Sequence, residues 1–168
     1  MVCMVQDIIQ YENGANMKHT FVICAYNESP FLEDCIKSLK RQRVKSYIKI
    51  ATSTPNKYIS NIAEKYNIEV FENGLKTECD ISNIGRDWQF AYNIAKTDMV
   101  TIAHQDDYYL KDYVSDLLKY KKKYPDMMLF TTSSITLKNN KLIPLGKVEI
   151  VKKLLRLPLR CNLLNHLK

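Results

Sequence analysis

Apolar residues along this chain alternate between short runs of strand length and stretches with helical spacing. The first run, 20–26, is rich in β-branched and aromatic residues, which favour a β-strand. Ser29 then suits the N-cap of a helix, and Pro30 suits its first position. The apolar residues that follow have the spacing of one helical face: Phe31, Leu32, Cys35, Ile36 and Leu39.

The same strand-and-helix unit repeats along the chain. Further strands are expected at 47–51, 68–71, 99–103 and 127–137, and further helices after Thr54 and Pro55, at 86–96 and at 111–124. Asn139 and Asn140 suit a hairpin turn to 141–144, and a last helical stretch, 148–157, stops at Pro158. Strands that alternate with helices predict an α/β fold whose mostly parallel sheet is covered by helices on both faces.

Length and composition indicate one globular domain. At 168 residues, with 46% hydrophobic and 26% charged residues, the chain can bury a core and lacks the signature of disorder. Residues 1–16 show no clear periodicity and are interpreted as an N-terminal extension. The predicted domain spans 17–147, and 148–168 is interpreted as a basic helical tail.

The formal charge of +7 comes mostly from this tail. Residues 141–168 carry seven Lys and Arg against one Glu, which leaves +1 for the first 140 residues. A nucleic-acid-binding domain carries its basic residues as a patch interleaved with aromatics on the folded body. Nucleic acid is therefore not an expected partner.

Cysteines and apolar runs bear on the compartment. The five cysteines are irregularly spaced and contain no CxxC pair, so the sequence predicts reduced thiols and neither a zinc site nor a disulfide framework. No apolar run approaches the roughly 18 residues of a membrane span, and the N-terminus lacks the pattern of a signal peptide. A cytoplasmic protein is expected.

Polar clusters directly follow three of the predicted strands. They are Ala25-Tyr26-Asn27-Glu28 after the first strand, Thr52-Ser53-Thr54 after the second, and His104-Gln105-Asp106-Asp107 after the fourth. In an open parallel sheet, ligands bind outside the carboxyl ends of the strands, because those loops emerge on one side and helix N-termini point there. All three clusters are therefore expected on one edge of the sheet.

The adjacent carboxylates of Asp106 and Asp107 have two interpretations. Like charges raise each other's pKa unless a positive group intervenes, and Mg²⁺ or Mn²⁺ commonly binds through one or two carboxylates together with substrate phosphates. The alternative is a solvated turn in which Asp107 merely leads into a helix. The four glycines form no GxGxxG or GxxxxGK[ST] loop, which argues against nicotinamide and P-loop chemistry and leaves a cation as the means of holding phosphate.

Three stretches of this sequence resemble the motifs of family-two glycosyltransferases in the expected order. They are FVICAYNES from Phe21, GRDWQFAYNIA from Gly85 and MVTIAHQDD from Met99. The resemblance covers roughly residues 18–145 and implies a GT-A fold, which is a Rossmann-like parallel sheet. It also implies transfer of a sugar from a nucleoside diphosphate sugar, with UDP the commonest donor nucleotide, to a glycan or lipid-linked acceptor of the kind used in cell-surface polysaccharide biosynthesis.

Position by position, the resemblance implies a role for each polar cluster. Residues lining or closing the nucleoside pocket are Ala25, Tyr26, Asn27, Glu28, Thr52 and Ser53, and residues of the following helix that meet the donor are Asp87 and Trp88. Asp106 would be the principal metal ligand, and Asp107 would share the metal or brace it. Trp88 also has a plainer interpretation as a core aromatic, because Ala91 and Ala95 share its helical face.

Two departures from the family pattern stand out. His104 and Gln105 replace the first residues of the commoner Asp-x-Asp-Asp form, and the resemblance implies that both bind the nucleotide. An imidazole would then contact ribose or phosphate, or bind the cation, where a carboxylate is usual. The carboxylate that usually follows the second strand is also missing, because Thr52-Ser53-Thr54 offers only hydroxyls.

An inverting transferase also needs a general base near the acceptor hydroxyl. The acidic residues that follow Asp107 are Asp112, Asp116, Asp126 and Glu149. The first three lie on or just after the predicted helix at 111–124, and only Glu149 lies farther along the chain. The chain is therefore expected to stop before its acceptor half is complete, so a non-catalytic nucleotide-binding module is the main alternative. A nucleotidyltransferase is a third interpretation. Such enzymes usually carry a glycine-rich stretch after the first strand, and Ala25-Tyr26-Asn27-Glu28 contains no glycine. The tail at 148–168 is either the opening helix of the acceptor half or a basic segment that contacts anionic lipid.

Overall fold

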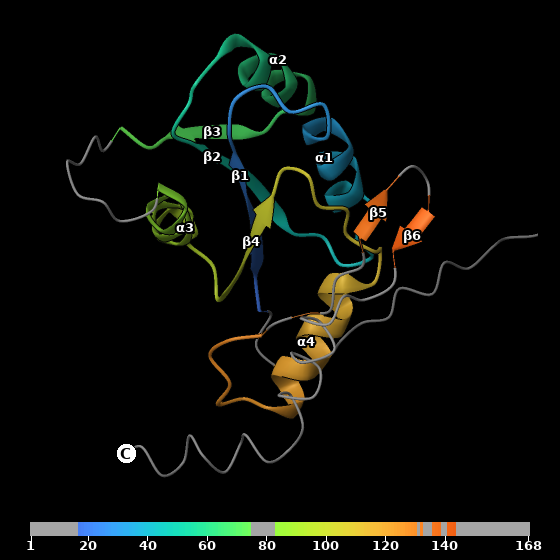
Figure 1. The fold of residues 1–168 in the computed structure, drawn as a ribbon. Helices are drawn as coiled ribbons and strands as arrows, with labels where there is room; N and C mark the ends of the chain where they lie inside the picture. Colours follow the sequence, from blue (N-terminus) through green and yellow to red (C-terminus); the bar gives the residue numbers. More distant parts are fainter. Residues whose placement is uncertain (1–16, 75–82, 131, 133–135, 139–140, 144–168) are drawn as a thin grey trace, which may run out of the picture. The chain divides into compact units, whose positions relative to one another are not determined.

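A computed structural model describes residues 17–74, 83–130, 132, 136–138 and 141–143 (Figure 1). The chain divides into two compact units, 1–127 and 128–168, and each unit is described by itself. The predicted extension at 1–16 and the predicted helical tail at 148–168 lie outside the described residues. Among the described residues, no helix is long and apolar enough to cross a membrane.

Unit 1 is built on a four-stranded sheet with the order β3-β2-β1-β4, and every neighbouring pair is parallel. The strands are β1 (His19–Ala25), β2 (Tyr47–Thr52), β3 (Glu69–Glu72) and β4 (Met99–His104). Six of the seven β1 residues are buried, as expected for a strand with a neighbour on each side and helices on both faces. The predicted parallel sheet is confirmed.

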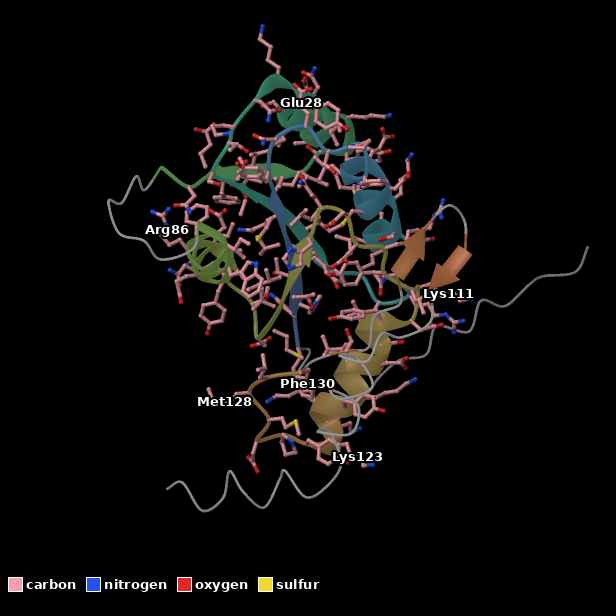
Figure 2. The ribbon with its side chains drawn as sticks, in the orientation of Figure 1. Glu28, Arg86, Lys111, Lys123, Met128 and Phe130 are labelled. Carbon is pink, nitrogen blue, oxygen red and sulfur yellow. The ribbon has the colours of Figure 1, made fainter. Side chains whose placement is uncertain are left out.

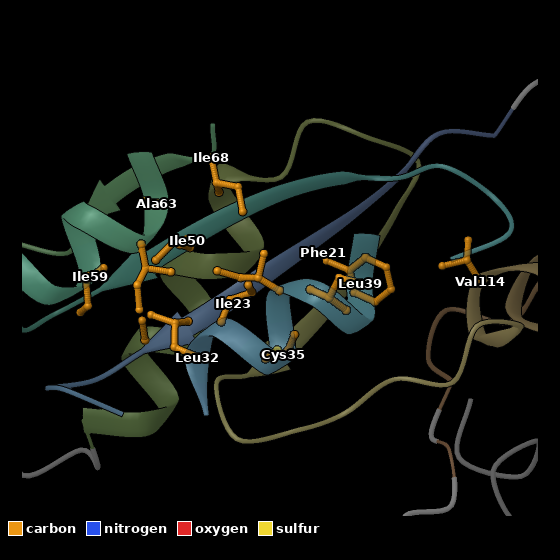
Figure 3. Close-up of a cluster of buried hydrophobic side chains, with 14 residues drawn as sticks. Phe21, Ile23, Leu32, Cys35, Leu39, Ile50, Ile59, Ala63, Ile68 and Val114 are labelled. Atoms are coloured by element: carbon orange, nitrogen blue, oxygen red, sulfur yellow. The ribbon is translucent and has the colours of Figure 1, made fainter. Parts of the chain in front are cut away.

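Helices alternate with these strands and cover both faces of the sheet (Figure 1). They are α1 (Leu32–Lys40), α2 (Lys57–Tyr66), α3 (Asn83–Ile94) and α4 (Tyr113–Lys123). Because side chains alternate along a strand, β1 supplies two cores. Phe21, Ile23 and Ala25 pack with residues of α1, α2 and α4 (Figure 3), whereas Val22 packs with Ala51 and with Ala91 of α3.

Two helices begin later than the sequence predicts. The N-cap of α1 is Phe31, and the Ser29 hydroxyl instead accepts a hydrogen bond from the Phe31 N–H (3.4 Å) within the preceding turn. The N-cap of α2 is Asn56, whose side chain accepts from the Ile59 N–H (2.9 Å). The prediction of Ser29 as the N-cap is therefore wrong, because the turn at Pro30 postpones the first helical residue.

His19 is a polar residue inside the core, at the start of β1. It is 2% exposed, and its ring nitrogens lie 2.9 Å from the Ser46 hydroxyl and 2.8 Å from the Thr101 hydroxyl. Burial lowers the pKa of the His19 imidazole to about 4, so the ring is neutral at pH 7. Its two hydroxyl partners satisfy both ring nitrogens, as a buried polar group requires.

In unit 2, β5 (Thr136–Lys138) pairs antiparallel with β6 (Lys141–Ile143), which confirms the predicted hairpin pairing. The prediction of one strand over 127–137 is wrong, because residues 127–130 are not strand. Met128 and Leu129 are 98% and 78% exposed, so apolar character there does not reflect burial in a sheet.

Candidate functional site

The carboxyl ends of β1, β2, β3 and β4 bring four polar loops to one edge of the sheet, where residues of α3 also lie. On the loop that follows β1, the side chains of Tyr26, Asn27 and Glu28 are exposed, and Figure 2 labels Glu28 there. Ala25 does not share this exposure, because its side chain is 3% exposed and belongs to the core. Three of the four residues predicted on this loop therefore present side chains at the edge.

The loop after β1 is fastened to the loop after β2. Asn27 has a positive φ of 51°, in the left-handed region that asparagine adopts more readily than most residues. Its N–H donates to the Thr54 hydroxyl (2.7 Å), and the Thr54 N–H donates to the Thr52 hydroxyl (3.1 Å). Thr52 is 2% exposed and Ala25 is 3% exposed, so the predictions that Thr52 closes the pocket and that Ala25 lines it stay predictions, with only their main chains at the edge. Both side chains stabilise the loops from beneath.

The side chain of Asp87, on α3, joins the ends of two strands, β2 and β3. Its carboxylate accepts hydrogen bonds from the Ser53 hydroxyl (3.1 Å) and from the Asn73 side-chain amide (3.0 Å), so it is held between β2 and β3. Asn73 also anchors its own loop by donating its N–H to the Thr52 carbonyl (2.7 Å). The Asn73 Oδ1 is buried and, among the described residues, has no hydrogen-bond partner. An orphaned acceptor of this kind fits a ligand N–H donor.

Trp88 and His104 form an aromatic pair at the same edge. Their ring centroids lie 5.6 Å apart in an edge-to-face arrangement, and Trp88 is 42% exposed. The interpretation of Trp88 as a core residue is wrong, because the core contact of α3 is made by Ala91, which is fully buried. The exposed pair offers an amphipathic surface on which a planar ligand group can rest.

Gln105 binds the main chain of the loop after β1. Its side-chain oxygen accepts from the Tyr26 N–H (3.0 Å), and its side-chain nitrogen donates to the Tyr26 carbonyl (2.8 Å). The four-residue cluster after β4 is thereby fixed against the four-residue cluster after β1.

Asp106 and Asp107 are exposed, and the Asp107 N–H donates to the His104 carbonyl (3.1 Å) in a tight turn. Buried Cys35 lies beneath, with its thiol donating to the His104 carbonyl (3.4 Å). Burial raises the pKa of the Cys35 thiol to about 12, and the charges of Asp107 and Asp106 add to the rise. Burial also raises the pKa of the Tyr109 phenol, with Asp107 as the next cause.

The donor set at this turn fits a hard divalent cation that shares its coordination with a ligand. No ion pair joins either carboxylate to a basic side chain within the described part of the chain. Over the same residues, no group of three or more His, Cys, Asp and Glu side chains is arranged to hold a metal by itself. Mg²⁺ and Mn²⁺ characteristically take one or two carboxylates and complete their shell with substrate phosphates and water.

A hollow of about 230 Å³ lies at the other end of α3, among Tyr92, Asn93, Thr97 and Asp98. Its one carboxylate, Asp98, already accepts a hydrogen bond from the Lys18 N–H (2.8 Å). The convergent polar groups and the free carboxylates are at the carboxyl edge of the strands, and we place the candidate site there.

A parallel sheet with helices on both faces and an acidic turn at the carboxyl end of β4 is the arrangement of the Rossmann-like GT-A fold. The sequence model of glycosyl transferase family 2 matches residues 20–163. The chain therefore belongs to glycosyl transferase family 2. No curated protein sequence matches the chain.

Solved structures share the fold at low sequence identity. TarS 1–349 of S. aureus is 20% identical, with a TM-score of 0.54, and the match covers 65% of this chain and 33% of that chain. The mannosyltransferase PcManGT from Pyrobaculum calidifontis, in complex with GDP-Man and Mn²⁺, is 16% identical with a TM-score of 0.51. The match covers 62% of this chain and 32% of that chain. This chain thus spans about a third of the length of these relatives.

The same fold extends to another class of enzyme. CMP:2-keto-3-deoxy-manno-octonic acid synthetase complexed with CTP is 14% identical with a TM-score of 0.51, and covers 66% of this chain and 49% of that chain. At such identities, likeness shows the fold alone. The family match, and not the fold, separates a glycosyltransferase from a nucleotidyltransferase here.

Proposed function

We propose that this chain carries the donor-binding site of a glycosyltransferase that moves a sugar from a nucleoside diphosphate sugar to a hydroxyl acceptor. The proposal depends on three features that meet at one edge of the sheet. They are the acidic turn at Asp106 and Asp107, the loop that carries Tyr26, and Asp87 with its hydrogen bonds to Ser53 and Asn73. The family match and two structures of similar fold support it, since TarS was solved with UDP-GlcNAc and PcManGT with GDP-Man.

The residues divide into a nucleoside side and a diphosphate side. On the nucleoside side are the exposed residues Tyr26, Asn27 and Glu28, with Ser53 and the Asp87–Asn73 pair nearby. We assign recognition of the nucleobase to Asn73 and Asp87, because the buried Asn73 Oδ1 accepts no hydrogen bond from the described residues. UDP is the proposed nucleotide, because TarS was solved with UDP-GlcNAc and the N3–H of uracil can donate to this acceptor, as N–H groups of the other bases also can.

On the diphosphate side, Asp106 and Asp107 would hold Mn²⁺ or Mg²⁺. Such an ion, when bound, stabilises the negative charge that develops on the leaving diphosphate. The acidic turn is rigid, because the Asp107 N–H and the Cys35 thiol both bind the His104 carbonyl. The Trp88–His104 pair borders this turn and is assigned to the ribose or the transferred sugar.

Transfer with inversion requires a carboxylate that accepts the proton of the acceptor hydroxyl. We place no base among the described residues: Asp112 pairs with Arg43 (2.8 Å), and Asp116 pairs with Lys119 (3.1 Å) on α4. Glu149 lies outside the described residues. The acceptor, proposed to be a glycan or lipid-linked hydroxyl, is therefore not defined by this site. Peripheral contact of residues 148–168 with a membrane stays a proposal.

Titration calorimetry with UDP and GDP, in Mn²⁺ and in a chelator, tests the donor site. We expect metal-dependent binding that is lost in Asp106→Asn and retained in the control Asp116→Asn, which removes an equally exposed carboxylate from the α4 surface. Equal affinity of Asp106→Asn and the unaltered protein in Mn²⁺ would remove the acidic turn from the site.

A donor-hydrolysis assay separates transferase from binding module. Release of free sugar from the donor, with or without an added acceptor, supports an active transferase. Tight, metal-dependent UDP binding without any turnover supports the alternative, a nucleotide-binding module.

A further inference from the structure

Gln105 makes an unusual contact for a residue in a polar turn. Its planar amide bonds to both main-chain groups of Tyr26, a residue 79 positions away in the sequence, at 3.0 Å and 2.8 Å. The side chain therefore behaves as a surrogate peptide group. The Gln105 side chain is half-buried, Tyr26 is exposed, and both hydrogen bonds lie at the solvent-exposed edge of the sheet.

The contact continues the β1–β4 pairing beyond the end of the sheet. The last paired residues are Cys24 and His104, and the chain of β4 turns away directly afterwards at the acidic turn. Without Gln105, among the described residues, the main chain of Tyr26 would have no bond to the β4 side. The next residue, Asn27, is held on the opposite side by the Thr54 hydroxyl (2.7 Å).

We propose that Gln105 is a positioning residue: it fixes the Tyr26 loop at a set distance from the acidic turn, so that one ligand engages both at once. This inference rests on the proposed function, because it concerns a nucleoside diphosphate that spans the two loops. Gln105 then acts through Tyr26 and Asp106, and its own amide is committed to the main chain instead of the ligand.

The chemistry of the side chain supports this role. Only an amide of this length offers one donor and one acceptor to a single peptide group, whereas a carboxylate offers two acceptors and would face the Tyr26 carbonyl with like charge. A ligand that spans two fastened loops binds as one unit, while loops that move independently must be ordered at the moment of binding.

The test compares a spanning ligand with its two halves. Gln105→Met keeps the length and packing of the side chain but removes both hydrogen bonds. The ligands are UDP with Mn²⁺, uridine alone, and pyrophosphate with Mn²⁺. Uridine is measured by ligand-observed NMR, and pyrophosphate is measured by calorimetric competition with UDP in Mn²⁺. We expect affinity for Mn²⁺ and UDP to fall roughly tenfold, as loss of two hydrogen bonds suggests. Affinity for each half is expected to change less than twofold.

Thr97→Val is the matched control. It also removes two hydrogen bonds, to the Thr20 hydroxyl (2.8 Å) and the Met99 carbonyl (2.9 Å), but at the other end of the strands. It is expected to lower the unfolding midpoint like Gln105→Met and to leave UDP affinity unchanged. If Gln105→Met fails to fold, Gln105→Asn retains the amide but shortens its reach, and is expected to show the same selective loss.

Each outcome decides the inference. Loss of a half-ligand as large as the loss of UDP would make Gln105 a direct ligand and overturn the proposal. Unchanged UDP affinity, or an equal loss in Thr97→Val, would also overturn it. If the unaltered protein binds no nucleoside diphosphate in Mn²⁺, the proposed function itself has failed, and the positioning role fails with it.

Discussion

Acidification is expected to weaken this fold through His19 before it affects the surface carboxylates. The imidazole is 2% exposed and bonded to the Ser46 and Thr101 hydroxyls, and burial lowers its pKa from 6.5 to about 4. In the unfolded chain the ring takes up a proton as the pH falls below 6.5, whereas in the folded protein it does not until about pH 4. Stability linked to His19 is therefore present above pH 6.5 and lost as the pH falls toward 4.

The size of the effect follows from the two pKa values. Linkage between 6.5 and about 4 gives a loss of about 2 kcal/mol in the free energy of unfolding by pH 5 and about 3 kcal/mol by pH 4. Such a loss is a large part of the stability of a domain, which is typically about 5–15 kcal/mol. A lower urea midpoint at mildly acid pH is therefore expected.

Urea unfolding followed by circular dichroism, repeated across this pH range, measures the loss. His19→Gln offers hydrogen-bonding groups at a similar reach but does not titrate, so its stability should be lower near neutrality and nearly flat between pH 6.5 and 4.5. Glu33→Gln is the control, because hydrogen bonds from Lys65, Tyr66 and Lys37 lower the pKa of Glu33 to about 2, and its contribution is lost only below pH 4.5. The same slope in His19→Gln as in the unaltered protein would refute the reasoning.

Three further predictions concern the site and the fold. Trp88 is the only tryptophan and lies beside His104, so Mn²⁺ with UDP should quench its fluorescence where Mg²⁺ does not, and Asp106→Asn should abolish the quenching; quenching that persists in Asp106→Asn would place the ion elsewhere. Ile36→Ala should cost roughly 2–5 kcal/mol in denaturant unfolding, because Ile36 is fully buried, while Ile84→Ala at a 59% exposed position should cost little; equal costs would contradict the assigned core. Asn56→Ala should cost about 1 kcal/mol by removing the cap on the Ile59 N–H, and an unchanged unfolding midpoint would show that the cap contributes nothing.

The sheet could be predicted because burial on two faces leaves a strong pattern in the sequence. β1 is an almost unbroken run of apolar and β-branched residues, and the helices that follow it present apolar residues on one side. The failure at 127–130 has the opposite cause. Met127, Met128, Leu129 and Phe130 have the same composition as a buried strand, and composition cannot tell exposed apolar residues from buried ones.

The site was predictable as a set of loops but not as a set of contacts. Position after a strand is enough to place Tyr26, Ser53 and Asp106 at one edge, since parallel strands end together. Nothing local in the sequence connects Gln105 with Tyr26 or Asn73 with Asp87, because each contact depends on strand register and on the approach of α3. The only local signal for Asn73 was its place in a polar Asn-Gly turn after a strand.

The contacts that order the proposed donor site all lie within unit 1. Asn27 to Thr54, Tyr26 to Gln105 and Ser53 to Asp87 join loops that the four parallel strands already bring together. Ordering these loops does not depend on any acceptor-side residue, so nucleotide binding and sugar transfer are separable properties of this architecture. Calorimetry on this chain therefore tests the donor site directly. Absence of turnover would bear on the general base, which is not assigned among the described residues, and not on the assignment of Asp106.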